Sequence, residues 1–274
     1  MTYRLVATDL DGTLLHDDLS VSPRTRAALD AVRAAGVPVV PVTARQPEGV
    51  RDIAEQAGID GWVLCSNGSL ALHWRTGERL FEQAIAVEAQ QELAAALNER
   101  IPGLLYASVR QGGEVFLAEH DYARSATYAD HKRDPESMAV AVLEDVLAEP
   151  SLKLVVRHLS RTPAELLEAA RELGVDGVEL THSDAPFLEV QPAGVTKASS
   201  LARLCEELGV DRSEVVAFGD APNDLEMVGW AGHGVAVAGA DAAVARAAAE
   251  VTGSNNADGV AQVLERMLEQ GELG

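Results

Sequence analysis

An apolar run that leads directly into two aspartates near the N-terminus constrains this chain more than any other feature. Leu5–Thr8 is followed by Asp9, Leu10, Asp11 and Gly12. A short apolar run predicts a buried strand, and ligands of open α/β sheets bind where such strands end. Gly12 permits a tight turn there. Two carboxylates in one crevice repel each other unless a cation lies between them. The stretch therefore predicts a cation site, with a plain acidic turn as the alternative.

Strands and helices alternate on both sides of a long middle segment. A helix begins at Pro23 with Ser22 as its cap, and the same alternation returns after Pro192. Such alternation is typical of a parallel, doubly wound sheet. The expected helices are 23–35, 47–56, 197–208, 223–230, 241–250 and 259–270, and the expected strands are 5–8, 37–43, 62–66, 214–218 and 234–238.

The middle segment follows another pattern. Its expected hairpin and strands are joined by short turns as well as by helices, which predicts a mixed or antiparallel sheet. The expected hairpin is 70–85, the helices are 87–100, 139–148 and 163–173, and the strands are 104–109, 114–119, 153–159, 177–181 and 187–190. We therefore expect an α/β fold: a Rossmann-like, doubly wound parallel sheet core formed by residues 1–83 and 187–274, with residues 84–186 inserted as a second α/β unit.

Composition narrows the partners. The net charge is −21, from 43 acidic and 22 basic residues, so the surface repels nucleic acid and anionic membranes. We expect neither as a partner. Cys65 and Cys205 lie in apolar segments, as buried reduced thiols do, and the N-terminus carries no signal-peptide pattern. These features predict a cytoplasmic protein. An anion site in such a chain must be local, and the chain has only three lysines, Lys132, Lys153 and Lys197.

Four polar features fall at the ends of core elements: Asp9 with Asp11, Thr43, Lys197, and the stretch Gly219–Asp224. Three of them follow parallel strands, whose carboxyl ends meet at one edge of the sheet, and Lys197 opens a helix that can reach the same edge. Carboxylates suit a hard cation such as Mg²⁺. A lysine and a threonine hydroxyl suit a phosphoryl group beside the metal.

At these residues the whole chain resembles the haloacid dehalogenase (HAD)-like phosphohydrolases, and within them the Cof-type group with a large inserted cap. Asp9–Leu14 is similar to the first family motif, Thr43 to the second, Lys197 to the third and Gly219–Asp224 to the fourth. Asn67–Gly68 and Ser254–Val260 are similar to further signatures of the group. The first and fourth motifs together are specific, whereas Thr43 alone is not.

The chain departs from the family pattern at three places. Ala44 and Ala198 stand where glycine is common, and Ala238–Ala240 replaces a Gly–Asn–Ala stretch that follows a matching strand. No catalytic group is lost, but the last change bears on substrate preference. Arg45 is expected to be an exposed loop residue.

The resemblance implies a role for each matching residue. Asp9 would be the nucleophile that forms an aspartyl phosphate, and Asp11 would act as acid and then as base. Lys197, Thr43 and Asn67 would bind the phosphoryl oxygens. Mg²⁺ would be held by Asp9, the backbone carbonyl of Asp11 and Asp220, with Asn223 and Asp224 orienting ligands and waters. The expected metal ligands are thus Asp9, Asp11 and Asp220, and the expected orienting residues are Asn223 and Asp224.

The predicted function is a Mg²⁺-dependent phosphatase acting on a small phosphomonoester such as a sugar phosphate, nucleotide or cofactor phosphate. A phosphomutase would use the same residues. A nucleotide-sugar transferase and a non-catalytic phosphate- or sugar-binding protein are the alternatives from other classes. The insert, as the family's cap, would choose the substrate. Its least periodic stretch, 121–137, contains Arg124, His131, Lys132 and Arg133, and a solvated loop is preferred there over a specificity loop. Substrate and oligomeric state stay open.

Overall fold

The computed structural model describes residues 2–183 and 185–274. Its central layer is a sheet in the order β14-β13-β12-β1-β2, in which every neighbouring pair is parallel. The strands are β1 (Leu5–Thr8), β2 (Val39–Pro41), β12 (Val215–Gly219), β13 (His233–Ala236) and β14 (Glu250–Val251). Because β1 lies between β12 and β2, Asp9 leaves the sheet beside the ends of both neighbours.

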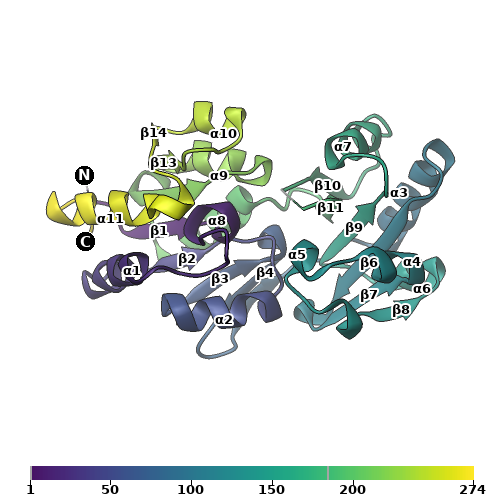
Figure 1. The fold of residues 1–274 in the computed structure, drawn as a ribbon, viewed down its shortest axis with the longest axis horizontal. Coiled ribbons are helices and arrows are strands. Elements are labelled where there is room, and N and C mark those ends of the chain that lie inside the picture. The colour runs from purple at the N-terminus through teal and green to yellow at the C-terminus, as the bar shows by residue number, and fades with distance from the viewer. Residues whose placement is uncertain (1, 184) are drawn as a thin grey trace.

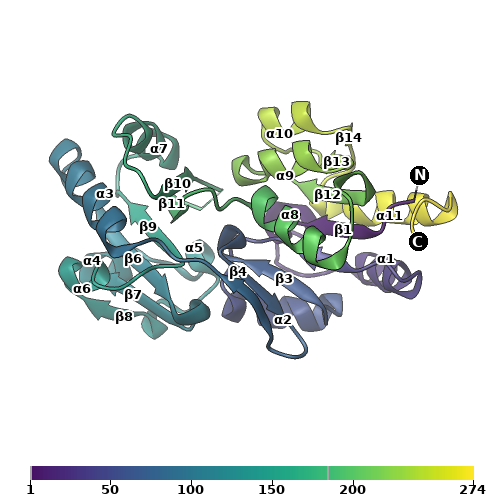
Figure 2. The same cartoon turned by 180° about the vertical axis from the view of Figure 1, so that it is seen from behind.

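Helices cover both faces of this sheet (Figures 1 and 2). They are α1 (Pro23–Ala34), α2 (Pro47–Ala57), α8 (Lys197–Leu208), α9 (Leu225–Trp230), α10 (Ala242–Ala247) and α11 (Gly259–Glu269). Along β1, Val6 packs in one cluster with α1, α2 and α11, whereas Leu5 and Ala7 pack in another with α8. Successive side chains of a strand point to opposite faces. The predicted doubly wound α/β core is confirmed.

A short hairpin extends the core at β2. β3 (Trp62–Cys65) adjoins β2 through a parallel bridge between Val42 and Leu64. It also forms an antiparallel sheet with β4 (Leu70–His73) and β5 (Arg79–Glu82). The predicted hairpin is confirmed, and β3 serves as the link between the two sheets.

The inserted unit, residues 84–192, is called the cap below. Its sheet has the order β10-β11-β9-β6-β7-β8, with antiparallel pairs except for β7 and β8. The strands are β6 (Leu105–Arg110), β7 (Val115–Glu119), β8 (Ala139–Ala141), β9 (Lys153–Arg157), β10 (Val178–Thr181) and β11 (Leu188–Pro192). The helices are α3 (Val87–Arg100), α4 (His120–Ser125), α5 (Tyr128–His131), α6 (Leu143–Val146) and α7 (Pro163–Arg171). The mixed sheet predicted for the insert is confirmed.

Buried apolar side chains divide the chain into the same two parts. Among the described residues, each hydrophobic cluster lies wholly in the core or wholly in the cap. Strand β11 pairs with β10 and β9, although we had expected the core to resume at residue 187. We therefore propose to place the second boundary after Pro192. Within 2–183 and 185–274, no helix is long and apolar enough to cross a membrane.

Three local predictions were wrong. The helix expected over 139–148 is divided into strand β8 and the short helix α6, because Ala139–Ala141 pairs with β7 at the sheet edge and tertiary pairing overrides helix propensity. The helix expected over 241–250 ends at Ala247, and Glu250 begins β14 beside β13. The stretch 121–137 is not a solvated loop, because it contains most of α4 and all of α5, and His131 and Arg133 are buried.

Candidate active site

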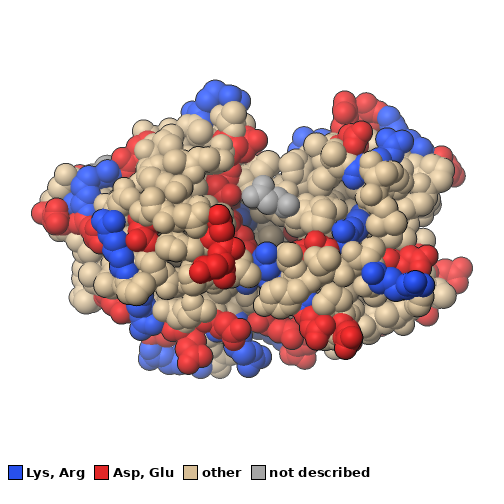
Figure 3. All heavy atoms as spheres, viewed as in Figure 1, with Lys and Arg blue, Asp and Glu red and all other residues tan. Residues whose placement is uncertain are grey.

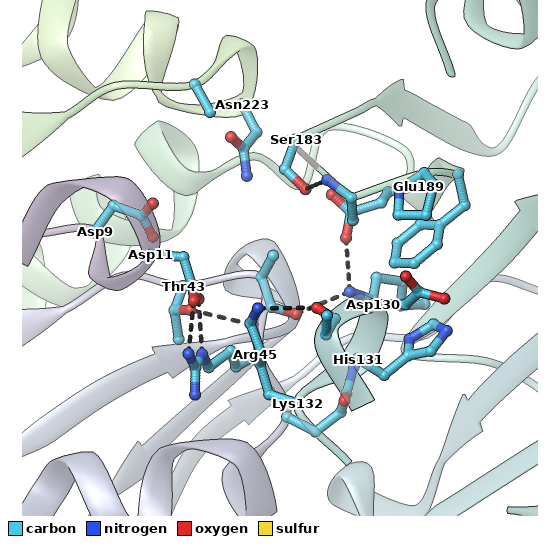
Figure 4. A pocket seen from close by; sticks show the side chains of 18 residues that line it. Asp9, Asp11, Thr43, Arg45, Asp130, His131, Lys132, Ser183, Glu189 and Asn223 are labelled. Carbon is cyan, nitrogen blue, oxygen red and sulfur yellow. Dashed lines mark hydrogen bonds and ion pairs between the residues drawn. The ribbon is translucent and has the colours of Figure 1, made fainter. Parts of the chain in front are cut away.

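A cavity of about 260 Å³ lies between the core and the cap. Figure 3 shows the molecule hollowed between its two halves, with acidic side chains beside the hollow on the core half. Both halves supply lining residues, and Figure 4 shows them from close by. The core supplies Asp9, Asp11, Thr43, Ala44, Arg45, Gln46, Ala221 and Asn223, and the cap supplies Ala129, Asp130, His131, Lys132, Lys153, Ser183, Ala185, Pro186, Phe187 and Glu189.

A tight turn places Asp9 and Asp11 at this cavity. β1 ends at Thr8, and the chain turns through Leu10–Leu14 with a φ of 76° at Gly12. A Cβ on Gly12 would lie 2.5 Å from Oδ2 of Asp220, so only glycine fits both the backbone angle and the approach. The Thr13 hydroxyl donates a hydrogen bond to Oδ1 of Asp220. The first motif thus folds directly against the fourth.

Lys197 joins the first motif to the fourth from the third. It is the first residue of α8, whose start is fixed by reciprocal hydrogen bonds between Thr196 and Ser199. Its Nζ lies 2.8 Å from Oδ1 of Asp9 and 2.7 Å from Oδ1 of Asp224. Burial lowers the pKa of Lys197, but the attraction of Asp224 and Asp9 outweighs burial and raises this pKa above its usual value. The ammonium therefore stays charged in an almost solvent-free position.

Three buried carboxylates gather where the cation site was expected. One oxygen from each of Asp9, Asp220 and Asp224 lies within 4.8 Å of the others. Oδ1 of Asp224 accepts from Lys197, and its Oδ2 accepts from the backbone N–H groups of Asp220 and Ala221, at 3.1 Å each. Both Asp224 oxygens thus bind protein donors, as the orienting role proposed for this residue requires.

The electrostatics of Asp9 call for a cation. Burial raises its pKa well above the usual value, Lys197 opposes the rise, and Asp224, Asp220 and Asp11 add to it. A single ammonium does not balance the three carboxylates of this cluster. Clustered carboxylate oxygens are the ligands that Mg²⁺ prefers. The residues present therefore fit the expected metal.

Asp11 directs its side chain away from this cluster. Nε and Nη2 of Arg45 donate to its two oxygens at 2.6 and 2.5 Å, and Nη1 of Arg45 donates to the carbonyl of Gly49 at 2.8 Å. For Asp11 as a metal ligand, this leaves the backbone carbonyl that we had assigned. Arg45 is 8% exposed, so the expectation of an exposed loop residue was wrong. A bidentate guanidinium fixes a carboxylate in one plane.

Thr43 and Asn67, two of the residues predicted to bind phosphate, lie at different cavities. Thr43 is buried at the cavity, and its Oγ1 accepts from the Arg45 N–H at 3.1 Å, which leaves its own proton for a ligand. Asn67 does not line this cavity but a neighbouring one of about 110 Å³, together with Lys197. Its amide donates to Glu189 at 3.3 Å and accepts from Asn223 at 3.0 Å. Asn223 lines both cavities.

The cap wall contains a buried ion pair that sequence reasoning missed. Lys153 and Glu189, both nearly fully buried, form an ion pair at 2.7 Å. His131 stacks on Phe187 with ring centroids 4.7 Å apart. The one available signal was a lysine inside an apolar strand of a chain with three lysines. The partner of that lysine could not be inferred, because it comes from another strand.

Comparison with known proteins bears on the family of this chain. Residues 6–264 match the family model of the haloacid dehalogenase-like hydrolases. A putative phosphatase of Haemophilus influenzae is 30% identical, over 97% of this chain and 98% of that protein. A pyridoxal phosphate phosphatase of Escherichia coli is 29% identical, over 96% and 98%.

A solved structure agrees with both. The crystal structure of a haloacid dehalogenase-like hydrolase from Bacteroides thetaiotaomicron is 29% identical and matches with a TM-score of 0.76. The match covers 97% of this chain and 100% of that one, so it includes the cap as well as the core. This chain belongs to the haloacid dehalogenase-like hydrolases, as an enzyme of their Cof-type phosphatase group.

Proposed function

We propose that the protein is a Mg²⁺-dependent phosphatase that hydrolyses small phosphomonoesters through an aspartyl phosphate on Asp9. The observation that carries this proposal is the position of Asp9: its carboxylate faces the cavity between core and cap (Figure 4), with Lys197 at 2.8 Å and Asp220 beside it. A carboxylate held between a fixed cation and a metal site is arranged to approach a phosphate dianion.

The residues divide the reaction between them. Asp9 attacks phosphorus as the bond from phosphorus to the leaving oxygen breaks. Asp11 in its protonated form, with one oxygen released from Arg45 to carry the proton, gives that proton to the leaving oxygen. Asp11 then takes a proton from the water that attacks the aspartyl phosphate, which releases phosphate and restores Asp9. Arg45 orients Asp11, while Lys197 and the Thr43 hydroxyl hold the phosphoryl oxygens. Bound Mg²⁺, held by Asp9, Asp220 and the Asp11 carbonyl, would supply charge neutralisation.

The cavity indicates a small substrate. A volume of about 260 Å³ is slightly below the range of ordinary ligand pockets. Its cap side offers an aromatic pair, His131 and Phe187, and a charged pair, Lys153 and Glu189. The similar Escherichia coli protein is named for pyridoxal phosphate, so cofactor phosphates belong in the first substrate panel together with sugar phosphates and nucleotides.

The test begins with phosphate release from this panel. Activity should require Mg²⁺, disappear in EDTA and return when Mg²⁺ is added back. Asp9→Asn should abolish turnover, because an amide is no nucleophile toward phosphorus. Full activity in chelator, or in Asp9→Asn, would overturn the proposal.

The covalent step has its own test. Asp11→Asn keeps the nucleophile but loses the acid and base, so turnover of an alkyl phosphate should fall by roughly 100- to 10,000-fold. With an activated aryl phosphate the adduct should form and persist, and mass spectrometry after rapid quenching should find one phosphoryl group on the peptide that contains Asp9. A phosphomutase would also form this adduct, but the wild type would pass it to an added sugar phosphate rather than to water.

A further inference from the structure

A buried chain of polar contacts crosses from the cap to the core beside the proposed site. Nζ of Lys153 donates to the carbonyl of Ala44 at 2.8 Å and to Oε1 of Glu189 at 2.7 Å. Oε2 of Glu189 accepts from the amide of Asn67. The cap pair therefore binds two separate loops of the core, those that follow β2 and β3.

The cap does not need this pair for its own packing. Leu154, Val156, Leu188 and Val190 pack in the cluster that includes α3 and α7, whereas Lys153 and Glu189 occupy the alternate positions of β9 and β11 and face the core. Taking both charges out of water is costly, and the cost is offset only when every partner is in place. Their core partners are in place only while the cap lies against the core.

The Ala44 carbonyl and the Arg45 N–H belong to one peptide group. Lys153 holds its oxygen from the cap, and Oγ1 of Thr43 accepts its N–H from the core. The peptide is thus fixed from both sides. The orientation of this peptide sets the direction of the Thr43 hydroxyl proton. It also sets the position from which the Arg45 side chain extends, and the guanidinium of that side chain binds Asp11.

Further contacts of the cap lie on the core residues that follow this peptide, at the start of α2. Arg133 forms an ion pair with Glu48 at 2.5 Å and donates to the carbonyl of Gly113 at 3.2 Å. A Cβ on Gly113 would lie 2.7 Å from Cδ of Pro47, so the cap turn packs closely on the start of α2. The segment 44–49 is therefore held by the cap along most of its length.

We propose that Lys153, together with Glu189, is a positioning residue that couples cap closure to the chemistry: by fixing the Ala44–Arg45 peptide, it sets the Thr43 hydroxyl and, through Arg45, the acid–base carboxylate of Asp11. This inference rests on the proposed phosphatase function. An open cap leaves the peptide without its outer partner, so the acid–base group is in place only when the site is covered.

The test compares Lys153→Met with Arg110→Met. Arg110 is the matched control because it is also a buried cap cation that donates to backbone carbonyls, those of Asp145 and Val146 at 2.6 and 2.7 Å, but it does so within the cap. In Lys153→Met, amide hydrogen exchange in peptides covering 43–50 should become faster than in wild type, and in Arg110→Met it should not. Identical exchange in wild type and Lys153→Met would overturn the inference.

Kinetics provide the second readout. Lys153→Met should lower kcat for an alkyl phosphate by about 10- to 100-fold, as loss of an orienting partner does. It should lower kcat less for an activated aryl phosphate, which needs little help from an acid. An equal loss on both esters would overturn the link to Asp11. If Lys153→Met does not fold, Glu189→Gln replaces it, with the same expected directions.

The two proposals fail separately. If the wild type with Mg²⁺ hydrolyses no phosphate ester, the proposed function fails, while the exchange comparison still tests the contact between cap and loop. If the wild type is active and Lys153→Met matches it in exchange and in the ratio of the two kcat values, the coupling fails and the phosphatase function stands.

Discussion

At the scale of single residues, His131 shows how the cap wall responds to acid. It is buried against Phe116, Tyr122 and Phe187, and its Nε2 lies 2.7 Å from the Tyr122 hydroxyl. Burial, with smaller effects from the cations Lys153, Arg157 and Arg133, lowers its pKa to about 3 although Asp130 opposes the shift. The folded protein therefore holds this imidazole neutral at pH values where an unfolded chain would protonate it.

This shift predicts a loss of stability in acid. Below the ordinary histidine pKa of about 6.5, His131 binds a proton in the unfolded chain but stays neutral in the folded protein. The free energy of unfolding therefore falls as the pH drops toward 3. Between pH 7 and pH 5 the contribution of His131 is about 2 kcal/mol. Urea unfolding of His131→Gln should show a pH dependence weaker by that amount, whatever its stability at pH 7. The same substitution at His120, on the cap surface, is the control. An equal pH dependence of the free energy of unfolding in His131→Gln and wild type would contradict the prediction.

At the scale of elements, the start of α8 decides where Lys197 stands. The reciprocal bonds of Thr196 and Ser199 fix the first turn, and Lys197 is the next residue. Thr196→Ala should lower the free energy of unfolding by about 1 kcal/mol, measured in urea, and should also reduce kcat/KM. Thr162→Ala removes the same kind of cap from α7, far along the chain from the proposed site. It should lower the free energy of unfolding by a similar amount without changing kcat/KM. An unchanged kcat/KM in Thr196→Ala would show that the N-terminal capping bonds of α8 do not position Lys197.

The elements that sequence predicted best are those with local causes. Strand β1 and helix α1 follow from an apolar run and from a Ser–Pro start. Strand β8 was missed because Ala139–Ala141 becomes a strand only by pairing with β7. The site divides in the same way. Asp9 could be predicted as a site residue because its motif is continuous in sequence, whereas the partners of Arg45 and Lys153 come from segments 34 and 36 residues away.

At the scale of the whole molecule, apolar packing lies within the core and within the cap, whereas polar contacts join the two units. Apolar clusters hold each unit together separately. The contacts between the units include the hydrogen bond of the buried Lys153 to the Ala44 carbonyl and the ion pair of Arg133 with Glu48. Interfaces of this polar kind permit units to move relative to each other. A net charge of −21 adds repulsion between the two halves, so a bound cation would favour closure.

The division of the chain predicts what the core does alone. Residues 84–192 would be replaced by a Gly–Ser linker that joins Gln83 to Ala193. Gln83 is anchored in the core by its N–H, which donates to the Ser69 carbonyl, and Ala193 lies shortly before the start of α8. Because the core clusters contain no cap residue, this variant should keep a native circular dichroism spectrum and a cooperative melting transition. It should still bind Mg²⁺ in calorimetry, since the proposed ligands Asp9, Asp11 and Asp220 all belong to the core. Its preference among small esters should be lost, because the cap wall is gone. Asp220→Asn in the same variant is the control and should bind Mg²⁺ far more weakly. A folded core without Mg²⁺ binding would show that the cap helps to build the metal site, contrary to the ligand set proposed above.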